Sequence, residues 1–204
     1  MAKTFLKFLE PYEKGLVSMG IKKKGVIIAV SGVSGSGKSM AVSFILETMP
    51  QLRRVYAGGV FREMAEKRGM SIEEFSKTRP KEDDYNLDRW MLKESIPGNV
   101  VSDGHIAAWV VGDWADLRIF IRCPLKKRAE RVAKREGVSR DEAFKKLQER
   151  DTANAYHYRK IYGIDINDMS IYHKVIDNSG SLEELRKQVL EALGTLNRIY
   201  LSQK

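Results

Sequence analysis

Residues 25–39 read Gly25-Val26-Ile27-Ile28-Ala29-Val30-Ser31-Gly32-Val33-Ser34-Gly35-Ser36-Gly37-Lys38-Ser39. The first part is a short, glycine-bounded run of β-branched residues, typical of a strand buried on both faces. Residues 32–39 match the pattern G-x-x-x-x-G-K-S in full. Glycines in such a loop let successive N–H groups point at one anion, and the helix that follows adds its positive end. The stretch therefore predicts a bound nucleoside triphosphate.

Two side chains of this loop have specific expected roles. Lys38 is expected to reach the β- and γ-phosphates, and Ser39 to supply an oxygen ligand for Mg²⁺. The residues expected to hold ATP are Gly32, Ser34, Gly35, Ser36, Gly37, Lys38, Ser39 and Met40. A chance glycine-rich turn is the alternative, and the position of the match between a predicted strand and a predicted helix disfavours it.

The rest of the chain alternates short apolar runs with longer helical segments. A length of 204 residues, 43% of them apolar, fits one domain. Further strands are predicted at Val100–Val101, Leu117–Ile121 and Lys174–Ile176. Helix starts are indicated where a capping serine precedes glutamate by three residues, at Ser71, Ser139 and Ser181. This order predicts an α/β domain over residues 25–204, in which helices cover both faces of a parallel sheet, preceded by a basic, helical extension of residues 1–24.

The basic charge is concentrated in two places. The net charge is +9, and residues 1–24 carry six lysines against two glutamates, whereas residues 122–135 carry seven basic residues against one acid. An excess of this size indicates an anionic partner. The longest apolar run, Ile106–Val111, is far short of the roughly 20 residues that cross a bilayer, so no membrane association is expected. The single cysteine, Cys123, indicates a reducing compartment, and we expect a cytoplasmic protein.

Missing motifs narrow the class of nucleotide-binding protein. Signalling GTPases need N-K-x-D, which does not occur, and the one D-x-x-G match, at residues 177–180, follows the last predicted strand. Motor-type ATPases end a key strand in Asp-Glu, whereas here Asp103 is followed by Gly104. A glycine at that point leaves room for an acceptor molecule beside the phosphates. Small-molecule kinases are therefore the leading class.

At this point the chain resembles the P-loop nucleoside monophosphate kinases, and among them the archaeal-type cytidylate kinases. The stretches that carry the resemblance are residues 32–39, 57–65, 87–89 and 161–172, the last reading Ile161-Tyr162-Gly163-Ile164-Asp165-Ile166-Asn167-Asp168-Met169-Ser170-Ile171-Tyr172. The resemblance implies a three-layer P-loop kinase fold with a helical acceptor-binding insertion near 58–95 and a helical lid near 125–160. It also implies transfer of the γ-phosphoryl group of ATP to CMP or dCMP, with small nucleotides as the partners.

Phosphoryl transfer requires positive charge around the migrating group, and the predicted lid supplies it. Arg128, Arg131 and Arg135 share one helical face by their spacing. The resemblance implies catalytic roles for Arg131 and Arg150 beside Lys38. The residues that it implies for the acceptor are Arg62, Asp88, Arg89, Asp103 and His105, with Asp103 also holding Mg²⁺ through a metal-bound water. A solvated surface position is the alternative for each of these arginines.

Histidine replaces arginine of the family pattern at His105 and at His157, and Asn154 replaces an acid. Imidazole lacks the bidentate fork of guanidinium and is mostly neutral unless a phosphate raises its pKa. Three interpretations stay open: an active cytidylate-type kinase, a kinase with a different small acceptor, and a nucleotide-binding regulatory protein with reduced turnover.

The N-terminal extension has helical spacing of its apolar residues, with Pro11 expected to interrupt the helix. We expect this extension to pack on the domain or on a second copy of the chain, without binding nucleic acid specifically. The protein is accordingly expected to be a monomer or a homodimer. Removal of the extension is expected to change stability or assembly and to leave Michaelis constants similar.

Overall fold

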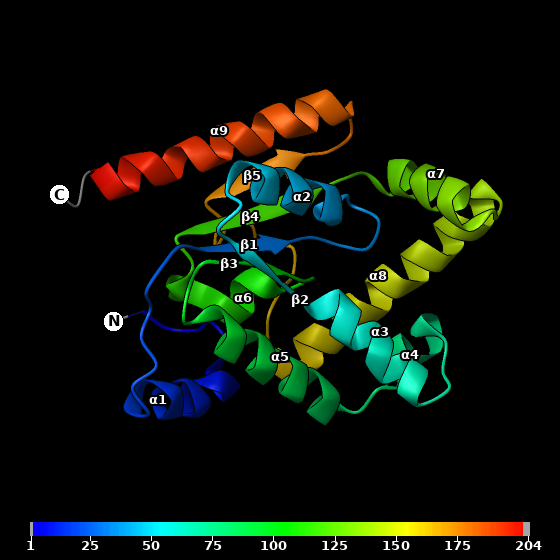
Figure 1. Ribbon diagram of the computed structural model, residues 1–204. Helices are drawn as coiled ribbons and strands as arrows, with labels where there is room; N and C mark the ends of the chain where they lie inside the picture. The colour runs from blue at the N-terminus through cyan, green and yellow to red at the C-terminus, as the bar shows by residue number, and fades with distance from the viewer. Residues whose placement is uncertain (1, 202–204) are drawn as a thin grey trace.

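The computed structural model describes residues 2–201 of the chain, and side chains as far as Leu196 (Figure 1). Its described part contains one parallel sheet of five strands in the order β2-β3-β1-β4-β5. The strands are β1 (Ile27–Ser31), β2 (Arg53–Tyr56), β3 (Val100–Asp103), β4 (Leu117–Arg122) and β5 (Lys174–Asp177). The predicted α/β fold with a parallel sheet is confirmed.

Helices cover both faces of this sheet, which gives three layers (Figure 1). On one face α2 (Lys38–Thr48) and α9 (Leu182–Leu201) pack over Ile28 and Val30 of β1. On the other face α6 (Ala107–Val111) and α5 (Lys81–Ser95) pack over Ile27 and Ala29. Since successive residues of a strand point to opposite faces, the whole of β1 is buried, as its run of β-branched residues predicts.

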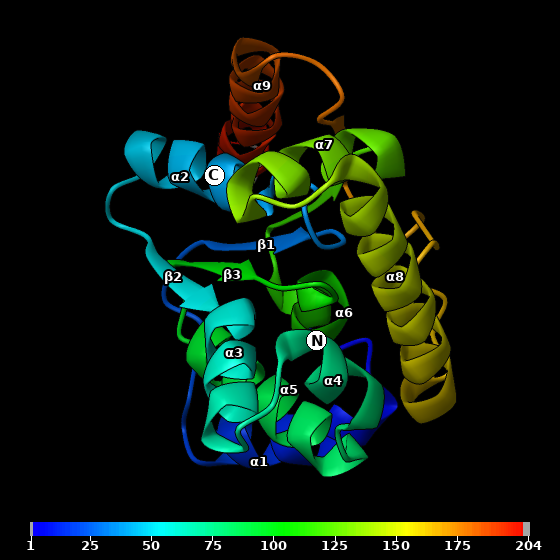
Figure 2. The same ribbon diagram turned by 90° about the vertical axis from the view of Figure 1, so that its right-hand side faces the viewer.

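Four of the other helices stand beyond the carboxyl ends of the strands. They are α3 (Ala57–Lys67), α4 (Ile72–Thr78), α7 (Leu125–Glu136) and α8 (Arg140–Tyr162). Figure 2 shows α8 running down from α7, and the middle of α8 passes beside α4. Helices α3, α4 and α5 match the segment expected near 58–95 to bind the acceptor, and α7 and α8 match the segment expected near 125–160 to form the lid, each to within two residues at the ends that differ. Both sets of helices face the space beside the loop 32–39.

The three predicted capping serines are confirmed. Ser71, Ser139 and Ser181 each accept a hydrogen bond from the backbone N–H of the glutamate three residues on, all at 3.1 Å. Strand β2, in contrast, was not predicted. It lies at the edge of the sheet and has charged residues at 53 and 54, so it lacks the apolar run of a central strand.

The N-terminal segment is part of the main core. It forms a 3₁₀ turn (Lys7–Leu9) and α1 (Glu10–Ser18), with Leu6, Leu9 and Leu16 almost completely buried. Pro11 lies in the first turn of α1, where its missing N–H costs nothing, so the expected interruption of the helix was wrong. Within residues 2–201, no helix is long and apolar enough to cross a membrane.

Candidate functional site

The loop 32–39 curls between β1 and α2 in the conformation that its glycines permit. Gly35 and Gly37 have φ angles of 74° and 94°, in the left-handed region. A Cβ atom on Gly37 would lie 2.0 Å from Nδ2 of Asn178, so a side chain there cannot be accommodated. Asn178 supports the loop because its Nδ2 donates to the carbonyl of Ser36 at 2.8 Å. The hydroxyl of Ser36 is buried without a partner among the described residues.

Lys38 is folded back onto this loop. Its Nζ donates to the carbonyl of Val33 at 3.0 Å. Burial lowers the pKa of Lys38 to about 8, the nearby carboxylate of Asp103 opposes that shift, and Arg150 adds to it. The ammonium group thus lies among other charges, in a position from which it can swing to a bound phosphate.

Arg54 joins Asp103 and Ser39, the two residues expected to hold Mg²⁺. The carboxylate of Asp103 is fully buried at the end of β3, and its Oδ1 has no hydrogen-bond partner in the described structure. Its Oδ2 accepts a hydrogen bond from Nε of Arg54 at 3.0 Å. Nη2 of Arg54 also donates to the hydroxyl of Ser39 at 3.1 Å. A carboxylate and a hydroxyl are ligands that suit Mg²⁺, and the unpaired Oδ1 is free to accept, so these residues fit the metal.

The three arginines of α7 have different environments. Arg131 is half-buried beside the loop, with Nη2 donating to Oδ1 of Asn178 at 3.4 Å. Arg128 is buried, donates to the carbonyl of Ser34 at 3.0 Å and pairs with Asp151 of α8 at 2.6 Å. It joins the loop to α8. Arg135 is exposed and pairs with its neighbour Glu136.

The stripe along α8 changes from apolar to polar as predicted. Ala143 and Leu147 are buried in a small core with α7, and Asn154 is buried farther along. Between them lies the half-buried Arg150, whose Nε is buried without a partner in the described structure. Burial lowers the pKa of Arg150, and its charge reaches both Lys38 and His105. Arg150 therefore contributes positive charge to the space beside the loop.

His105 lies against the loop. Its Nε2 is 3.2 Å from the hydroxyl of Ser34. Burial, followed by the charges of Lys38 and Arg150, lowers the pKa of His105 well below its ordinary value. The imidazole is therefore neutral at neutral pH, and the charged form considered from the sequence is disfavoured in this arrangement.

The residues of the segment 57–95 divide between an exposed and a buried side. Arg62 is exposed and its guanidinium donates to the hydroxyl of Tyr56. Asp88 is buried and accepts a hydrogen bond from the hydroxyl of Tyr162. Burial raises the pKa of Asp88 to about 8, although the bond from Tyr162 opposes that shift. Arg89 is half-buried and donates to Oδ1 of Asn86 at 3.2 Å.

A buried polar cluster links this segment to α8. Arg79 pairs with Asp84 at 2.9 Å, and Asp84 also lies 2.7 Å from Nε2 of His157. His157 is thus engaged by a carboxylate of the same protein. Sequence reasoning singled out neither Arg79 nor Asp84, because their partners lie in other elements. The available signal in the sequence was the position of Asp84 four residues, or one helical turn, before Asp88.

Other supporting residues were also missed. Arg54 and Asn178 follow unremarkable patterns, although Asn178 stands directly after the last strand, where polar side chains reach the ligand-binding edge of a parallel sheet. That position was a usable signal. For Arg54 no signal existed, because its strand was not predicted.

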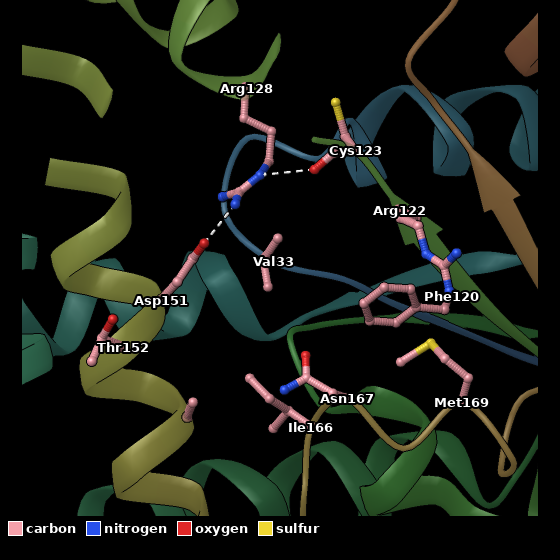
Figure 3. Close-up of a pocket in the computed structure, with 11 residues that line it drawn as sticks. Val33, Phe120, Arg122, Cys123, Arg128, Asp151, Thr152, Ile166, Asn167 and Met169 are labelled. Atoms are coloured by element: carbon pink, nitrogen blue, oxygen red, sulfur yellow. Dashed lines mark hydrogen bonds and ion pairs between the residues drawn. The ribbon is translucent and has the colours of Figure 1, made fainter. Parts of the chain in front are cut away.

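A pocket of about 450 Å³ opens next to the loop, between α8, β4 and residues 166–169 (Figure 3). Val33 contributes from the loop, and Phe120 and Arg122 contribute from β4. The ion pair between Arg128 and Asp151 borders it (Figure 3). The pocket shows that α8 leaves space between itself and the sheet.

Taken together, one edge of the sheet carries the glycine-rich loop 32–39, a carboxylate and a hydroxyl joined by Arg54, and several cationic side chains. The cations that converge there from four elements are Lys38, Arg54, Arg128, Arg131 and Arg150. Such an arrangement can bind a triphosphate and neutralise charge on a migrating phosphoryl group.

Comparison with known proteins gives consistent relatives. A family model described as the cytidylate kinase-like family matches residues 80–180. A cytidylate kinase of Pyrococcus horikoshii is 46% identical over 159 residues, which are 77% of this chain and 82% of that protein. A cytidylate kinase of Methanopyrus kandleri is 40% identical over 178 residues, 82% of this chain and 92% of that protein.

Solved structures share the fold at low identity. A gluconokinase from Sinorhizobium meliloti matches with a TM-score of 0.57 and 18% identity, covering 90% of this chain and 99% of that chain. An uncharacterized protein from Eubacterium ventriosum matches with a TM-score of 0.60 and 17% identity, covering 81% of this chain and 96% of that chain. At such identities the likeness concerns the fold alone, and the predicted P-loop kinase fold is confirmed.

Proposed function

Because this chain belongs to the cytidylate kinase-like family, we propose that it transfers the γ-phosphoryl group of ATP to CMP or dCMP. The observation that carries the proposal is the meeting of Lys38, Ser39 and Asp103 at one sheet edge, opposite the helices α3 to α5. In the reaction a phosphate oxygen of the acceptor forms a bond to the γ-phosphorus. The bond from that phosphorus to the β,γ-bridging oxygen breaks, and ADP leaves.

On the donor side, the N–H groups of residues 32–39 and the ammonium group of Lys38 hold the phosphates of ATP. Ser39 and Asp103 hold Mg²⁺, directly or through water, and the free Oδ1 of Asp103 supports that assignment. The bound ion supplies neutralisation of phosphate charge. Lys38 must exchange its bond to the carbonyl of Val33 for one to a phosphate oxygen.

On the acceptor side, helices α3 to α5 form the acceptor-binding insertion. Asp88 hydrogen-bonds the base, Arg62 and Arg89 contact the acceptor phosphate or its base, and His105 reads the acceptor beside the loop. Asp88 is supported by its burial and by the fixed bond from Tyr162. Arg62 is exposed and therefore free to move toward a bound phosphate.

Helices α7 and α8 form the lid, with Arg131 and Arg150 as the catalytic arginines. Both are half-buried beside the loop, and Nε of Arg150 is unpartnered among the described residues. A guanidinium with unused donors at that place stabilises charge as it develops on the transferring oxygens. The space beside α8 in Figure 3 gives this helix room to close on the loop.

The other two interpretations of the sequence receive less support. His105 and His157 left open a different acceptor or a regulatory protein with reduced turnover. His105 is bonded to Ser34 and His157 to Asp84. Each histidine therefore has a partner within the protein, and its presence in place of arginine is not by itself evidence that a phosphate contact was lost. The identity of 46% to a cytidylate kinase over most of the chain favours turnover of a cytidine nucleotide.

A coupled assay of ADP release tests the proposal. The acceptors are CMP, dCMP, UMP, AMP and GMP, with shikimate and gluconate as outside controls. We expect the highest kcat/KM for CMP or dCMP. Preference for another compound supports a different acceptor, and ATP binding without turnover of any acceptor supports the regulatory interpretation.

A further inference from the structure

The N-terminal segment, residues 2–21, is fastened to the domain at several places, and two of them involve Phe5 and Phe8. At the first, the backbone N–H of Phe5 donates to the carbonyl of Trp109 at 3.0 Å, and the N–H of Asp113 donates to Lys3 at 2.8 Å. A Cβ on Gly112 would lie 2.2 Å from the carbonyl oxygen of Lys3, so the two backbones are in close contact. These contacts attach the segment to the outer helical layer, away from the loop 32–39.

At the second place, Phe8 enters a group of aromatic rings from α5 and α8. Its ring stacks on Tyr85 with centroids 4.3 Å apart, and on Tyr162 with centroids 5.2 Å apart and planes within 13°. Tyr162 also lies nearly parallel to Tyr158, at 6.1 Å. Stacked contacts of this kind restrict the rotation of a ring in addition to burying it.

The ring that Phe8 restrains carries a polar group of the acceptor side. The hydroxyl of Tyr162 donates to Oδ2 of Asp88, which is buried on α5. Asp84 and Arg79 are the other charged groups near Asp88. A chain of contacts thus runs from Phe8, through Tyr162, to the carboxyl group assigned above to the acceptor base.

We infer that Phe8 and Tyr162 are positioning residues that orient Asp88 toward the acceptor, so that the N-terminal segment forms part of the acceptor-binding site. The inference rests on the proposed function. Tyr162 acts through its hydroxyl, and Phe8 acts by restraining the ring that carries the hydroxyl. Removal of residues 2–22 was expected from the sequence to leave the Michaelis constants similar. The inference instead predicts that this removal raises KM for the acceptor and leaves KM for ATP similar.

The test compares Phe8→Ala and Tyr162→Phe with the wild-type protein, using CMP and ATP as substrates. In both variants KM for CMP rises about 3-fold to 10-fold, the range for one hydrogen bond. KM for ATP and kcat at saturating CMP stay within about 2-fold, because the donor site is untouched. Tyr162→Phe keeps the aromatic packing, so it folds even where Phe8→Ala is too unstable to assay.

Phe5→Ala is the matched control. Phe5 lies in the same segment, packs edge-on against Trp109 at 6.3 Å and lies under the guanidinium of Arg118. It makes no aromatic contact with Tyr162, so its removal lowers Tm and leaves KM for CMP unchanged. When Phe8→Ala and Tyr162→Phe are combined, KM for CMP rises by less than the product of the two single effects, because both substitutions act on one hydrogen bond.

The outcomes separate the inference from the proposed function. Unchanged KM for CMP in both variants of an active enzyme overturns the inference and leaves the function standing. An equal rise for Phe5→Ala also overturns it, because the effect is then one of general stability. A wild-type protein that phosphorylates no nucleoside monophosphate overturns both.

Discussion

The guanidinium group of Arg54 lies between the carboxylate of Asp103 and the hydroxyl of Ser39 and is bonded to both. Asp103 and Ser39 are the two residues assigned to Mg²⁺, so a protein cation occupies the neighbourhood that the metal requires. In the same position the guanidinium group of Arg54 lies over the ring of Tyr56, 4.0 Å from its centroid. Binding of the metal and the ion pair to Arg54 therefore compete.

Arg54→Ala is expected to destabilise the protein and to strengthen its response to Mg²⁺. Loss of the guanidinium leaves the buried carboxylate unpaired, at a cost of about 1–3 kcal/mol in the free energy of unfolding. Mg²⁺ with ADP then stabilises the variant more than the wild type, because no cation must be displaced. The measurement is the rise in Tm of each protein as the Mg²⁺ concentration is increased in the presence of ADP. Arg53→Ala, which removes the exposed pair to Glu94, is the control, and equal Mg²⁺ responses in all three proteins would contradict the competition.

Lys38→Ala and Ser39→Ala are expected to lower kcat by about 10² or more, as removal of a comparable electrostatic stabiliser does. The first removes charge at the β- and γ-phosphates, and the second removes an oxygen assigned to Mg²⁺. Ser43→Ala is the control, since Ser43 lies one turn along α2 and its hydroxyl bonds only the carbonyl of Ser39 in the described structure. Wild-type kcat in either loop variant would refute the assignment of the loop.

Binding of ATP is expected to weaken as the pH rises above about 8. The pKa of Lys38 is lowered to about 8, so below that pH the free protein carries the ammonium form that attracts phosphate. Above it the neutral amine predominates, and affinity falls up to tenfold for each pH unit. Titration with a fluorescent ATP analogue between pH 6.5 and 9.5 measures the effect. Lys38→Ala should bind more weakly with a flat profile, and a decline that persists in this variant would assign the titration to another group.

Arg150→Ala is expected to lower kcat by about 10²-fold with little change in KM for ATP, because its contact forms with the migrating phosphoryl group. The half-buried position and unpartnered Nε of Arg150 support this expectation. Arg159→Ala lies on the same helix, removes an exposed pair to Asp165 and serves as the control. The same split is expected for Arg131→Ala. Unchanged kcat in both would return these arginines to a structural role.

Asp88 is expected to make stability depend on pH. Its pKa is raised by burial from 3.8 to about 8, so the folded protein keeps a proton that the unfolded chain loses. The contribution is therefore fully present below pH 4 and is lost as the pH rises through 8. Urea unfolding at pH 5 and pH 8.5 should show a larger loss for the wild type than for Asp88→Asn, which cannot ionise. Parallel losses in the two proteins would place the titration elsewhere.

Several features of this protein could be predicted from the sequence because each depends only on residues that are close together in the chain. The loop 32–39 needs only its own glycines and Lys38, and each capping serine needs only the glutamate three residues away. The strands β1 and β3 show apolar runs because a central parallel strand is buried on both faces. Each of these signals is complete within a few consecutive residues, so no distant partner is required to recognise it.

Only the tertiary structure decided which side chains are brought together. Arg54 bonds Asp103 from the edge strand β2, which has no apolar pattern. Phe8 stacks on Tyr162, although more than half of the chain separates the two residues in sequence. The neutral state of His105 follows from burial beside Lys38 and Arg150, which come from other elements. Charge state, ion pairing and ring stacking depend on neighbours within a few ångströms, and those neighbours are set by the packing of the sheet and helices rather than by adjacency in the chain.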